Sequence, residues 1–320
     1  MNHNHIADTH ALLNSTEASL TPTRRLALQT ALGLGYAASA MPLMAQTAVQ
    51  TSADGLTTGR VEIDVNGFKV PAYRSAPAGK NNLPVVLVIS EIFGVHEYIA
   101  DVTRRLAREG YLAIAPELFV RQGDPSQFKD IAKLQAELIS KVPDVQVMAD
   151  LDATMQWAAQ NGGNTNRAAI TGFCWGGRIT WLYAAHNPKV KAGMAWYGRM
   201  EGQTNANTPK HPVDLVTSLK APVLGLYGGA DTGIPVTSIN TMKEALAQAA
   251  VKGNPAAKGS AFVLYPEAPH AFHADYRASY RAGPAADGWS RAVAWLGSNN
   301  TSKPSAASCF KRQTPAPCAV

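Results

Sequence analysis

The segment that decides the fold joins two short apolar runs through a turn rich in glycine. It reads Arg167-Ala168-Ala169-Ile170-Thr171-Gly172-Phe173-Cys174-Trp175-Gly176-Gly177-Arg178. Its pattern predicts a strand over 167–171, a tight turn at Cys174 and a helix over 178–186. Such a turn exposes its central side chain above the sheet, and the glycines prevent clashes within it. Cys174 is therefore a candidate thiol nucleophile, with a buried structural cysteine as the alternative.

Strand-like and helix-like segments alternate on both sides of this turn. Continuous apolar runs, typical of parallel strands buried on both faces, cover 84–89, 111–115, 190–197, 222–227 and 261–265. Helical spacing covers 99–108, 125–141, 145–160, 235–250 and 287–296. Asn66-Gly67 predicts a hairpin between strands over 60–65 and 68–73. This order predicts a single α/β domain with a mostly parallel central sheet and helices on both faces.

The first 45 residues have the layout of an export signal. Arg24-Arg25 precedes a moderately apolar segment over 26–45, which ends in small residues. A basic junction, an apolar core and a small-residue cleavage site indicate a signal peptide, and the paired arginines resemble the twin-arginine type. The segment is too weakly apolar for a stable membrane span. We predict a periplasmic or secreted protein, with a cytoplasmic protein carrying a disordered tail as the alternative.

The other boundaries follow from composition. Residues 46–59 are small and polar and predict a linker, the domain covers 60–298, and 299–320 predict a flexible tail. Cys309 and Cys318 in that tail would pair only in an oxidising compartment, and inert cysteines are the alternative. A net charge of +6 without a long basic run predicts no nucleic-acid partner. We see no metal-ligand set, expect no cofactor and favour a monomer.

Two acids and a histidine follow other predicted strands. Glu91, Asp231 and His270 each come shortly after the end of a strand. In open α/β sheets the carboxyl ends of the strands share one edge, so these side chains are expected near Cys174. The order nucleophile, acid, histidine is that of α/β-hydrolases. The alternatives are a solvated glutamate, an ordinary turn aspartate and a surface histidine.

Four segments together resemble the dienelactone hydrolase family of α/β-hydrolases. They are Glu91-Ile92-Phe93-Gly94-Val95, Gly172-Phe173-Cys174-Trp175-Gly176-Gly177, the turn at Asp231, and His270-Ala271-Phe272. The resemblance covers roughly 61–296 and implies an α/β-hydrolase that cleaves a small ester or lactone. It implies that Cys174 attacks the acyl carbon, His270 moves protons and Asp231 orients the imidazole.

The resemblance also assigns supporting groups. The backbone N–H groups of Ile92 and Trp175 would form the oxyanion hole. Glu91 would contact the resting thiol, keep it protonated and yield when substrate arrives, which implies a nucleophile activated by its own substrate.

Substrate recognition departs from the family pattern. Family members hold a substrate carboxylate with arginines, one of them shortly after the catalytic histidine. Here the first arginine after His270 is Arg277, later than that pattern. Arg199, Arg281 and Tyr197 are further candidates. A general carboxylesterase and a non-catalytic protein that binds a ligand or senses oxidants through its thiol are the alternative functions.

Overall fold

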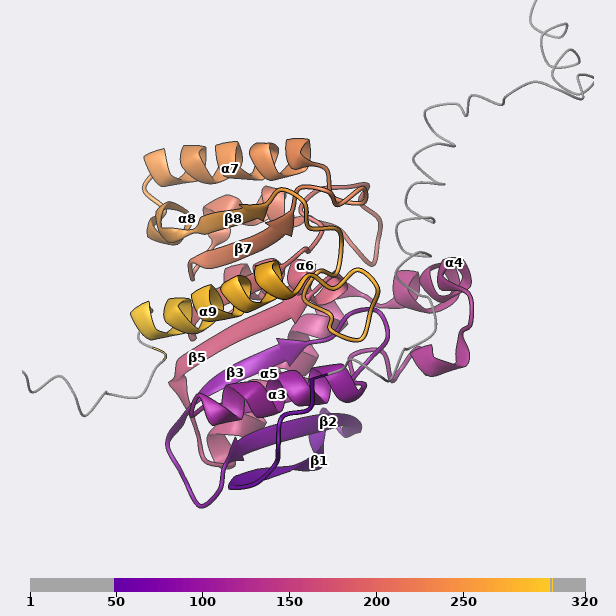
Figure 1. Cartoon of the computed structure of the whole chain (residues 1–320), viewed down its shortest axis with the longest axis vertical. Coiled ribbons are helices and arrows are strands. Elements are labelled where there is room, and N and C mark those ends of the chain that lie inside the picture. The colour runs from indigo at the N-terminus through magenta and orange to yellow at the C-terminus, as the bar shows by residue number, and fades with distance from the viewer. Residues whose placement is uncertain (1–48, 300, 302–320) are drawn as a thin grey trace, which may run out of the picture.

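The computed structural model describes residues 49–299 and 301. The described residues form an eight-stranded sheet of order β1-β2-β4-β3-β5-β6-β7-β8 (Figure 1). β1 is antiparallel to β2 and β2 to β4, whereas the other neighbouring pairs are parallel. The strands are β1 Leu56–Val65, β2 Phe68–Pro77, β3 Leu83–Ile89, β4 Leu112–Pro116, β5 Gly163–Phe173, β6 Val190–Trp196, β7 Val223–Gly228 and β8 Ala261–Tyr265.

Helices cover both faces of this sheet, as predicted. In Figure 1, α3 and α9 lie in front of the sheet, and α5 and α6 lie behind it. The longer helices are α3 Glu97–Arg108, α5 Asp144–Gln160, α6 Trp175–His186, α7 Val236–Val251 and α9 Ala282–Ser298, and a short helix, α8, covers Pro255–Gly259. The strand order and the two helical layers are those of an α/β-hydrolase fold, which confirms the predicted class.

The core lies between these layers. Every residue of β3 and β4 is buried, because helices cover both faces of these central strands. Burying each large aliphatic side chain contributes about 1.5–3 kcal/mol. At the edge of the sheet, β1 instead alternates between more and less exposed residues. The central strands therefore provide a rigid base for the loops at their carboxyl ends.

The predicted hairpin is confirmed. Asn66 and Gly67 both have positive φ angles, of 53° and 88°. Two successive positive φ angles define the turn that matches the twist of paired strands. Val65 pairs with Phe68 across it, and Asp64 Oδ1 accepts a hydrogen bond of 2.8 Å from the Gly67 N–H.

The single helix predicted over 125–141 is wrong. The segment contains four short pieces: a 3₁₀ turn Pro125–Gln127, α4 Ile131–Lys133, a π-helical turn Leu134–Leu138 and a 3₁₀ turn Ile139–Lys141. Phe128 and Asp130 have extended backbone angles. Asp130 caps the Lys133 N–H at 2.8 Å, so the chain starts a new helical turn there instead of continuing the first one.

Several predicted boundaries also move. β1 begins at Leu56, so the predicted linker over 46–59 overlaps the fold and the domain start at 60 falls inside a strand. The helix after the turn begins at Trp175 instead of 178, because it starts directly after Cys174. The last helix begins at Ala282 instead of 287. The predicted signal peptide, Cys309 and Cys318 lie outside the described residues.

The polar, irregular sequence of 198–217 predicts a loop over the site, but the segment contains regular structure. Pro212–Ser218 forms a 3₁₀ helix, capped by reciprocal hydrogen bonds between His211 and Asp214. The Asn207 carbonyl accepts from the Asp144 N–H at 2.8 Å, which ties the segment to the start of α5. Its position over the site stays a prediction.

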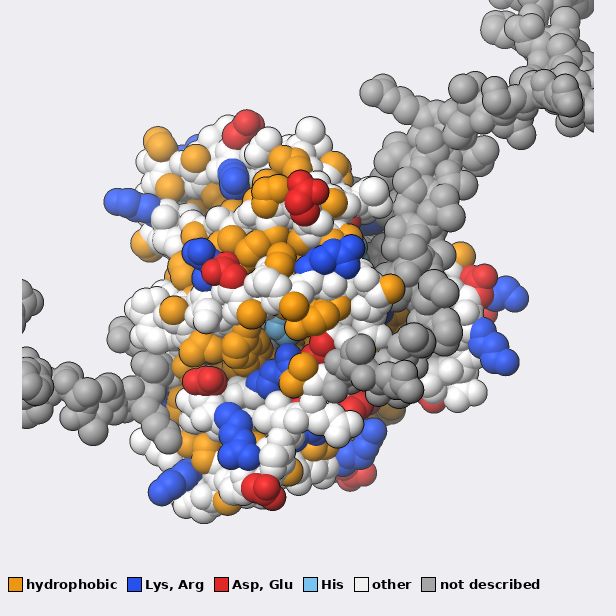
Figure 2. Space-filling view, in the orientation of Figure 1, with side chains coloured by type: hydrophobic (Ala, Val, Ile, Leu, Met, Phe, Trp, Pro, Cys, Tyr) orange, Lys and Arg blue, Asp and Glu red, His pale blue; other side chains and the backbone are white. Residues whose placement is uncertain are grey.

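Two surface observations concern possible partners. Within the described ranges, no helix combines the length and the apolar character needed to cross a membrane. On the face shown in Figure 2, Lys and Arg side chains are interspersed with Asp and Glu and do not gather in one basic patch.

Candidate active site

The turn at Cys174 is the sharpest feature of the backbone. β5 ends at Phe173 and α6 begins at Trp175, so Cys174 alone makes the reversal, with φ 55° and ψ −113°. A residue with a Cβ rarely adopts a positive φ, and the surrounding structure has to hold it there. The Cys174 N–H donates to the Trp196 carbonyl at 3.0 Å, and its carbonyl accepts from the Gly177 N–H at 3.0 Å.

The glycines around this turn are sterically required. A Cβ on Gly172 would lie 2.1 Å from the carbonyl oxygen of Gly176. A Cβ on Gly176 would lie 2.4 Å from the Ile89 carbonyl oxygen, and one on Gly177 would lie 2.5 Å from that of Trp196. These are backbone atoms that no side-chain movement can displace. The glycine pattern is therefore a direct consequence of the close approach of three strand ends.

His270 connects Cys174 to Asp231. Its Nδ1 lies 2.6 Å from Asp231 Oδ2, and Cys174 forms a hydrogen bond with the same imidazole. The other oxygen of Asp231 accepts from the N–H groups of Gly233 at 2.8 Å and Ile234 at 3.1 Å. The carboxylate is thus fixed by the backbone of its own turn. The three predicted residues, from the ends of three strands, meet in one place.

The charges around His270 determine its protonation. Burial alone would lower the pKa of His270, but the charges of Asp231 and Cys174 and its hydrogen bonds to both raise it to about 10. The imidazole is therefore protonated at neutral pH. The imidazolium therefore lies within hydrogen-bonding contact of the Cys174 sulfur.

Glu91, just after the end of β3, is buried with only 1% of its surface exposed. The Tyr276 hydroxyl donates to its Oε2, and the same oxygen lies 3.7 Å from Arg277 Nη2 and 3.8 Å from His96 Nε2. Burial alone would raise the pKa of Glu91, but the Arg277 charge and the contacts with His96 and Tyr276 lower it to about 2. Glu91 is therefore a carboxylate. Its expected contact with the resting thiol stays a prediction.

Comparison with known proteins places this geometry in a family. The model of the dienelactone hydrolase family matches residues 70–299. The chain belongs to the dienelactone hydrolase family. Members of this family are carboxylic ester hydrolases, so the chain is an enzyme that acts on a small molecule.

Individual relatives agree with this assignment over nearly their whole lengths. A protein of Methylorubrum extorquens named "Putative carboxymethylenebutenolidase" is 56% identical over 285 residues, 89% of this chain and 96% of its own. A protein of the same name from Escherichia coli K12 is 54% identical over 82% of this chain and 94% of its own. The crystal structure of a "Putative Dienelactone Hydrolase" from Klebsiella pneumoniae is 55% identical, with a TM-score of 0.72, and covers 76% of this chain and 98% of that one.

The predicted substrate-binding residues of this member of the dienelactone hydrolase family divide into two groups. Arg277 and Tyr197 lie in the site: the Arg277 guanidinium stacks 4.7 Å above the Phe93 ring, and the edge of Tyr197 meets the His270 ring at 5.1 Å between centroids. Among the described residues, neither Arg277 Nε nor the Tyr197 hydroxyl has a hydrogen-bond partner, although both atoms are buried. They are buried donors without a protein acceptor among the described residues, and their role in substrate binding stays a prediction.

The other two arginine candidates make different contacts. Arg199 lies beside Gly202 and His211 in the segment after β6. Arg281 is exposed and donates to the carbonyls of Ala278 and Tyr280 in its own loop. The role predicted for both arginines in substrate binding stays a prediction.

The backbone groups expected to form the oxyanion hole come from adjoining segments. Gly176, in the first turn of α6, packs directly against the carbonyl groups of Ile89 and Ser90. This contact brings the loop that carries Ile92 against the turn that carries Trp175. The joint role of their N–H groups stays a prediction.

Some residues of the site had no clear sequence signal. Tyr276 and His96 belong to no motif in the sequence, yet both contact Glu91. Their position beside Arg277 and the Glu91 segment is the only sequence signal that would have found them. His273, three positions after His270, contacts a different group: its Nδ1 is 2.6 Å from the Tyr98 hydroxyl, and burial lowers its pKa to about 3.

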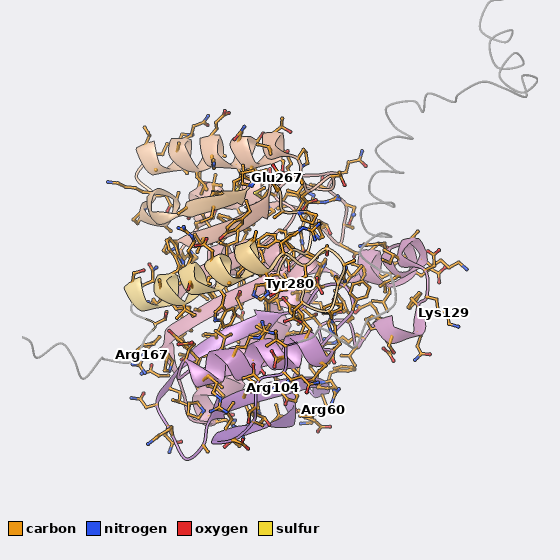
Figure 3. The ribbon with its side chains drawn as sticks, viewed as in Figure 1. Arg60, Arg104, Lys129, Arg167, Glu267 and Tyr280 are labelled. Atoms are coloured by element: carbon orange, nitrogen blue, oxygen red, sulfur yellow. The ribbon has the colours of Figure 1, made fainter. Side chains whose placement is uncertain are left out.

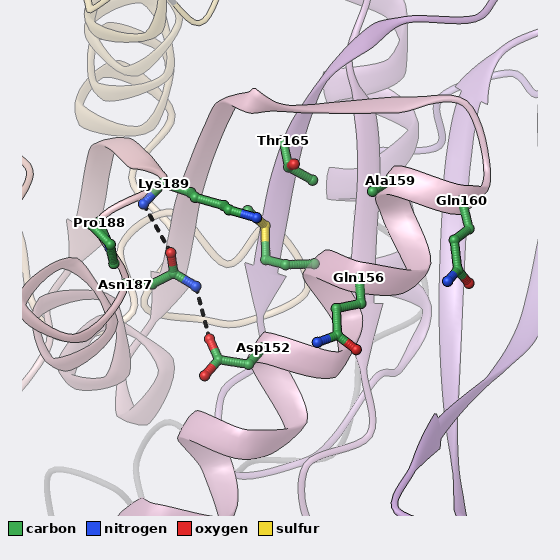
Figure 4. Close-up of a pocket in the computed structure, with 9 residues that line it drawn as sticks. Asp152, Gln156, Ala159, Gln160, Thr165, Asn187, Pro188 and Lys189 are labelled. Atoms are coloured by element: carbon green, nitrogen blue, oxygen red, sulfur yellow. Dashed lines mark hydrogen bonds between the residues drawn. The ribbon is translucent and has the colours of Figure 1, made fainter.

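Two cavities differ in their relation to the site. One of about 400 Å³ is lined by Phe93, His96 and Phe119, among others, and adjoins both Arg277 and the turn, because Phe119 packs on Trp175 at 4.8 Å between ring centroids. The second, of about 460 Å³, lies around α5 and the amino end of β5, away from Cys174 (Figure 4). Asp152 in this second cavity already accepts hydrogen bonds from Tyr183, His186 and Asn187.

Proposed function

We propose that the chain hydrolyses an ester or lactone of the dienelactone type through Cys174, His270 and Asp231 and a thioester intermediate. The observation that supports this most strongly is the position of His270. It contacts the sulfur and holds Asp231 at 2.6 Å. A thiol, an imidazole and a carboxylate in this order form the arrangement used for nucleophilic acyl transfer.

The first half of the reaction forms the thioester. The sulfur of Cys174 attacks the acyl carbon, and the N–H groups of Ile92 and Trp175 stabilise the negative charge that develops on the acyl oxygen. The bond to the leaving oxygen then breaks, and the His270 imidazolium gives its proton to that oxygen. Each donor to an oxyanion is typically worth about 100- to 1,000-fold in rate.

The second half releases the acid. His270, now neutral, takes a proton from water, which attacks the thioester carbon; the carbon–sulfur bond breaks and the thiolate returns. Asp231 stabilises the imidazolium each time it forms and keeps the Nδ1 proton on its own side of the ring. The backbone hydrogen bonds of Gly233 and Ile234 hold that carboxylate in place.

Arg277 supports a substrate with a carboxylate group. Its guanidinium is 4% exposed, and its closest charged partner is Glu91 at 3.7 Å, beyond hydrogen-bonding distance. An incoming carboxylate would form direct charge-assisted hydrogen bonds with Arg277 and the Tyr197 hydroxyl and so compete with Glu91. Release of Glu91 from Arg277 would couple the site to the presence of its own substrate. The adjoining cavity beside Phe93 would hold the rest of the molecule.

Two substitutions test the reaction. We expect Cys174→Ala and His270→Ala to lose activity towards p-nitrophenyl acetate and an enol lactone. Intact-mass measurements on His270→Ala incubated with a lactone library should reveal an acyl group on Cys174, because deacylation is slowed. Unchanged turnover by purified, folded Cys174→Ala would contradict the proposal. A non-catalytic ligand binder would instead bind without forming the adduct.

We also propose that the chain is exported to the periplasm or secreted. The proposal rests on the paired arginines and the small residues before 46 in the sequence. N-terminal sequencing of the protein after expression in a bacterium with active twin-arginine export tests it. A mature chain that begins close to 46 supports export, and a full-length cytoplasmic protein contradicts it.

A further inference from the structure

The segment 49–52, in front of β1, is bound to α3. The Thr51 N–H donates to Asp101 Oδ1 at 2.6 Å, and the Thr51 hydroxyl donates to Asp101 Oδ2 at 3.3 Å. In the other direction, Arg104 Nε donates to the Thr51 carbonyl at 3.0 Å, and Arg108 donates to the Ser52 carbonyl at 2.9 Å. These contacts fix a segment that belongs to no helix or strand.

The same face of α3 binds the loop over 266–281, between β8 and α9. Arg105 bridges the two: its Nε lies 2.5 Å from Asp101 Oδ2, and its Nη2 lies 2.5 Å from Asp275 Oδ2. Asp275 also accepts a hydrogen bond from the backbone N–H of Val49. Figure 3 shows Arg104 on α3 and Tyr280 near the end of this loop. The segment 49–52 therefore contacts the loop directly and through α3.

Burial makes these contacts consequential. Asp101 is 1% exposed and Asp275 is 2% exposed. A buried carboxylate is strongly disfavoured unless charged or hydrogen-bonding groups surround it. Two buried carboxylates share the Arg105 guanidinium, so the N–H groups of Thr51 and Val49 supply donors that Arg105 alone does not. Without the segment, the loop would be expected to shift until Asp275 regains partners.

The loop carries the reactive groups. It contains His270, and Tyr276 and Arg277 follow Asp275 directly in sequence. The loop has turns but no helix or strand of its own, and Ala271 within it has a φ of 58°. Contacts with the rest of the fold therefore determine the conformation of this loop. Asp275 makes one of these contacts, directly before Tyr276 and Arg277, which both contact Glu91.

We propose that the segment 49–52 is a positioning element of the active site, which acts through Asp101 and Asp275 to hold the loop that carries His270 and Arg277. It rests on the proposed function in treating His270 and Arg277 as working groups. A cut at the predicted signal boundary, after 45, would leave this segment in the mature chain.

Thr51→Pro in the full chain tests the proposal. Proline removes the N–H and the hydroxyl that bind Asp101 but keeps the carbonyl that binds Arg104. We expect kcat for p-nitrophenyl acetate to fall about ten-fold with little change in KM, because small displacements of reacting groups reduce the rate more than binding. Thr51→Ser keeps both donors and should restore kcat. Ser52→Ala, which removes only a hydroxyl bound to Asp54, is the matched control.

A second variant and a second readout make the result decisive. Asp275→Asn removes the charge that pairs with Arg105 and should lower kcat similarly; it replaces Thr51→Pro if that chain does not fold.

Alkylation of Cys174 by iodoacetamide at pH 6, followed by intact mass, requires no turnover. We expect it to slow about ten-fold in both variants. If the wild type hydrolyses no ester, the proposed function fails while alkylation still tests positioning. Wild-type kcat and alkylation in folded Thr51→Pro and Asp275→Asn would overturn it.

Discussion

The turn at Cys174 and the loop over 266–281 meet at one site but are held in place by different means. The turn is fixed by its own sequence, because each of its glycines faces a backbone atom closer than 3 Å from a hypothetical Cβ. The loop is fixed by distant residues, since Tyr276 and Glu91 are 185 positions apart and Arg105 and Asp275 are 170 apart. The proposed nucleophile is thus placed by local sterics, and the proposed proton carrier is placed by long-range contacts.

This difference has a chemical use. The nucleophile and the oxyanion donors have to lie at fixed distances from each other, and close packing of three strand ends provides that rigidity. The loop carries Arg277 and His270, which in the proposed reaction respond to a substrate and exchange protons. An attachment by ion pairs and hydrogen bonds can be adjusted without unfolding the sheet.

Gly176→Ala tests whether sterics fix the turn at Cys174, and it should produce the largest change in the free energy of unfolding. The new Cβ would lie 2.4 Å from the Ile89 carbonyl oxygen. We expect a loss of about 4 kcal/mol or more in the free energy of unfolding, measured by urea denaturation, or failure to fold. Gly283→Ala in the first turn of α9 is the control, because nothing lies within 4 Å of its Cβ position. Equal stabilities of the two variants would contradict the steric account of the turn.

The contrast also explains what could be predicted from the sequence. Cys174, its glycines and the order of strands are visible because local sterics and apolar runs determine them. Asp231 and His270 could be placed because parallel strands end at one edge of the sheet. Tyr276 could not, because only the folded loop brings it to Glu91, and His96 lies close to Glu91 in sequence but belongs to no motif.

One helix prediction was wrong for a related reason. The segment 125–141 has helical spacing, but the Asp130 side chain accepts a hydrogen bond from the Lys133 N–H, and a new helical turn begins there. A capping residue in the middle of a periodic segment competes with helix continuation, and tertiary packing decides the outcome.

Glu91→Gln tests the contacts of Glu91 with Tyr276 and Arg277 in the loop over 266–281. The pKa of Glu91 lies near 2 in the folded chain, because burial is outweighed by the Arg277 charge and the contacts with His96 and Tyr276, and near 4.5 in the unfolded chain. Its contribution to stability is therefore complete above about pH 4.5 and is lost as the pH falls towards 2. At neutral pH we expect Glu91→Gln to be less stable by an amount on the order of 3 kcal/mol.

Urea unfolding at several pH values measures this effect. The difference between wild type and Glu91→Gln should shrink steadily below about pH 4.5. Glu267→Gln, which changes an exposed glutamate of the same loop (Figure 3), should show no such trend. A difference that stays constant with pH would mean that the Glu91 charge is not what holds Tyr276 and Arg277.

Arg277→Lys tests whether the loop recognises a carboxylate. Lysine keeps the positive charge beside Glu91 but lacks the planar group that binds a carboxylate through two donors. We expect kcat/KM to fall about 30-fold for a lactone bearing a carboxylate, a loss of about 2 kcal/mol, and only slightly for p-nitrophenyl acetate. Arg281→Lys, in an exposed arginine of the same loop, should change neither value. Equal losses for both substrates would assign Arg277 a purely structural role.

Tyr98→Phe should give the smallest effect and tests how far the loop depends on α3. The variant leaves the buried His273 Nδ1 without the hydroxyl that lies 2.6 Å from it. Because His273 is neutral and buried, an unpartnered ring nitrogen costs about 1.5 kcal/mol in the free energy of unfolding. Tyr280→Phe, in the same loop, removes a hydroxyl that has no hydrogen bond among the described residues and should be neutral. A stability loss without any change in kcat would mean that the Asp275–Arg105 contact alone positions His270. A parallel fall in kcat would mean that the His273–Tyr98 contact positions His270 as well.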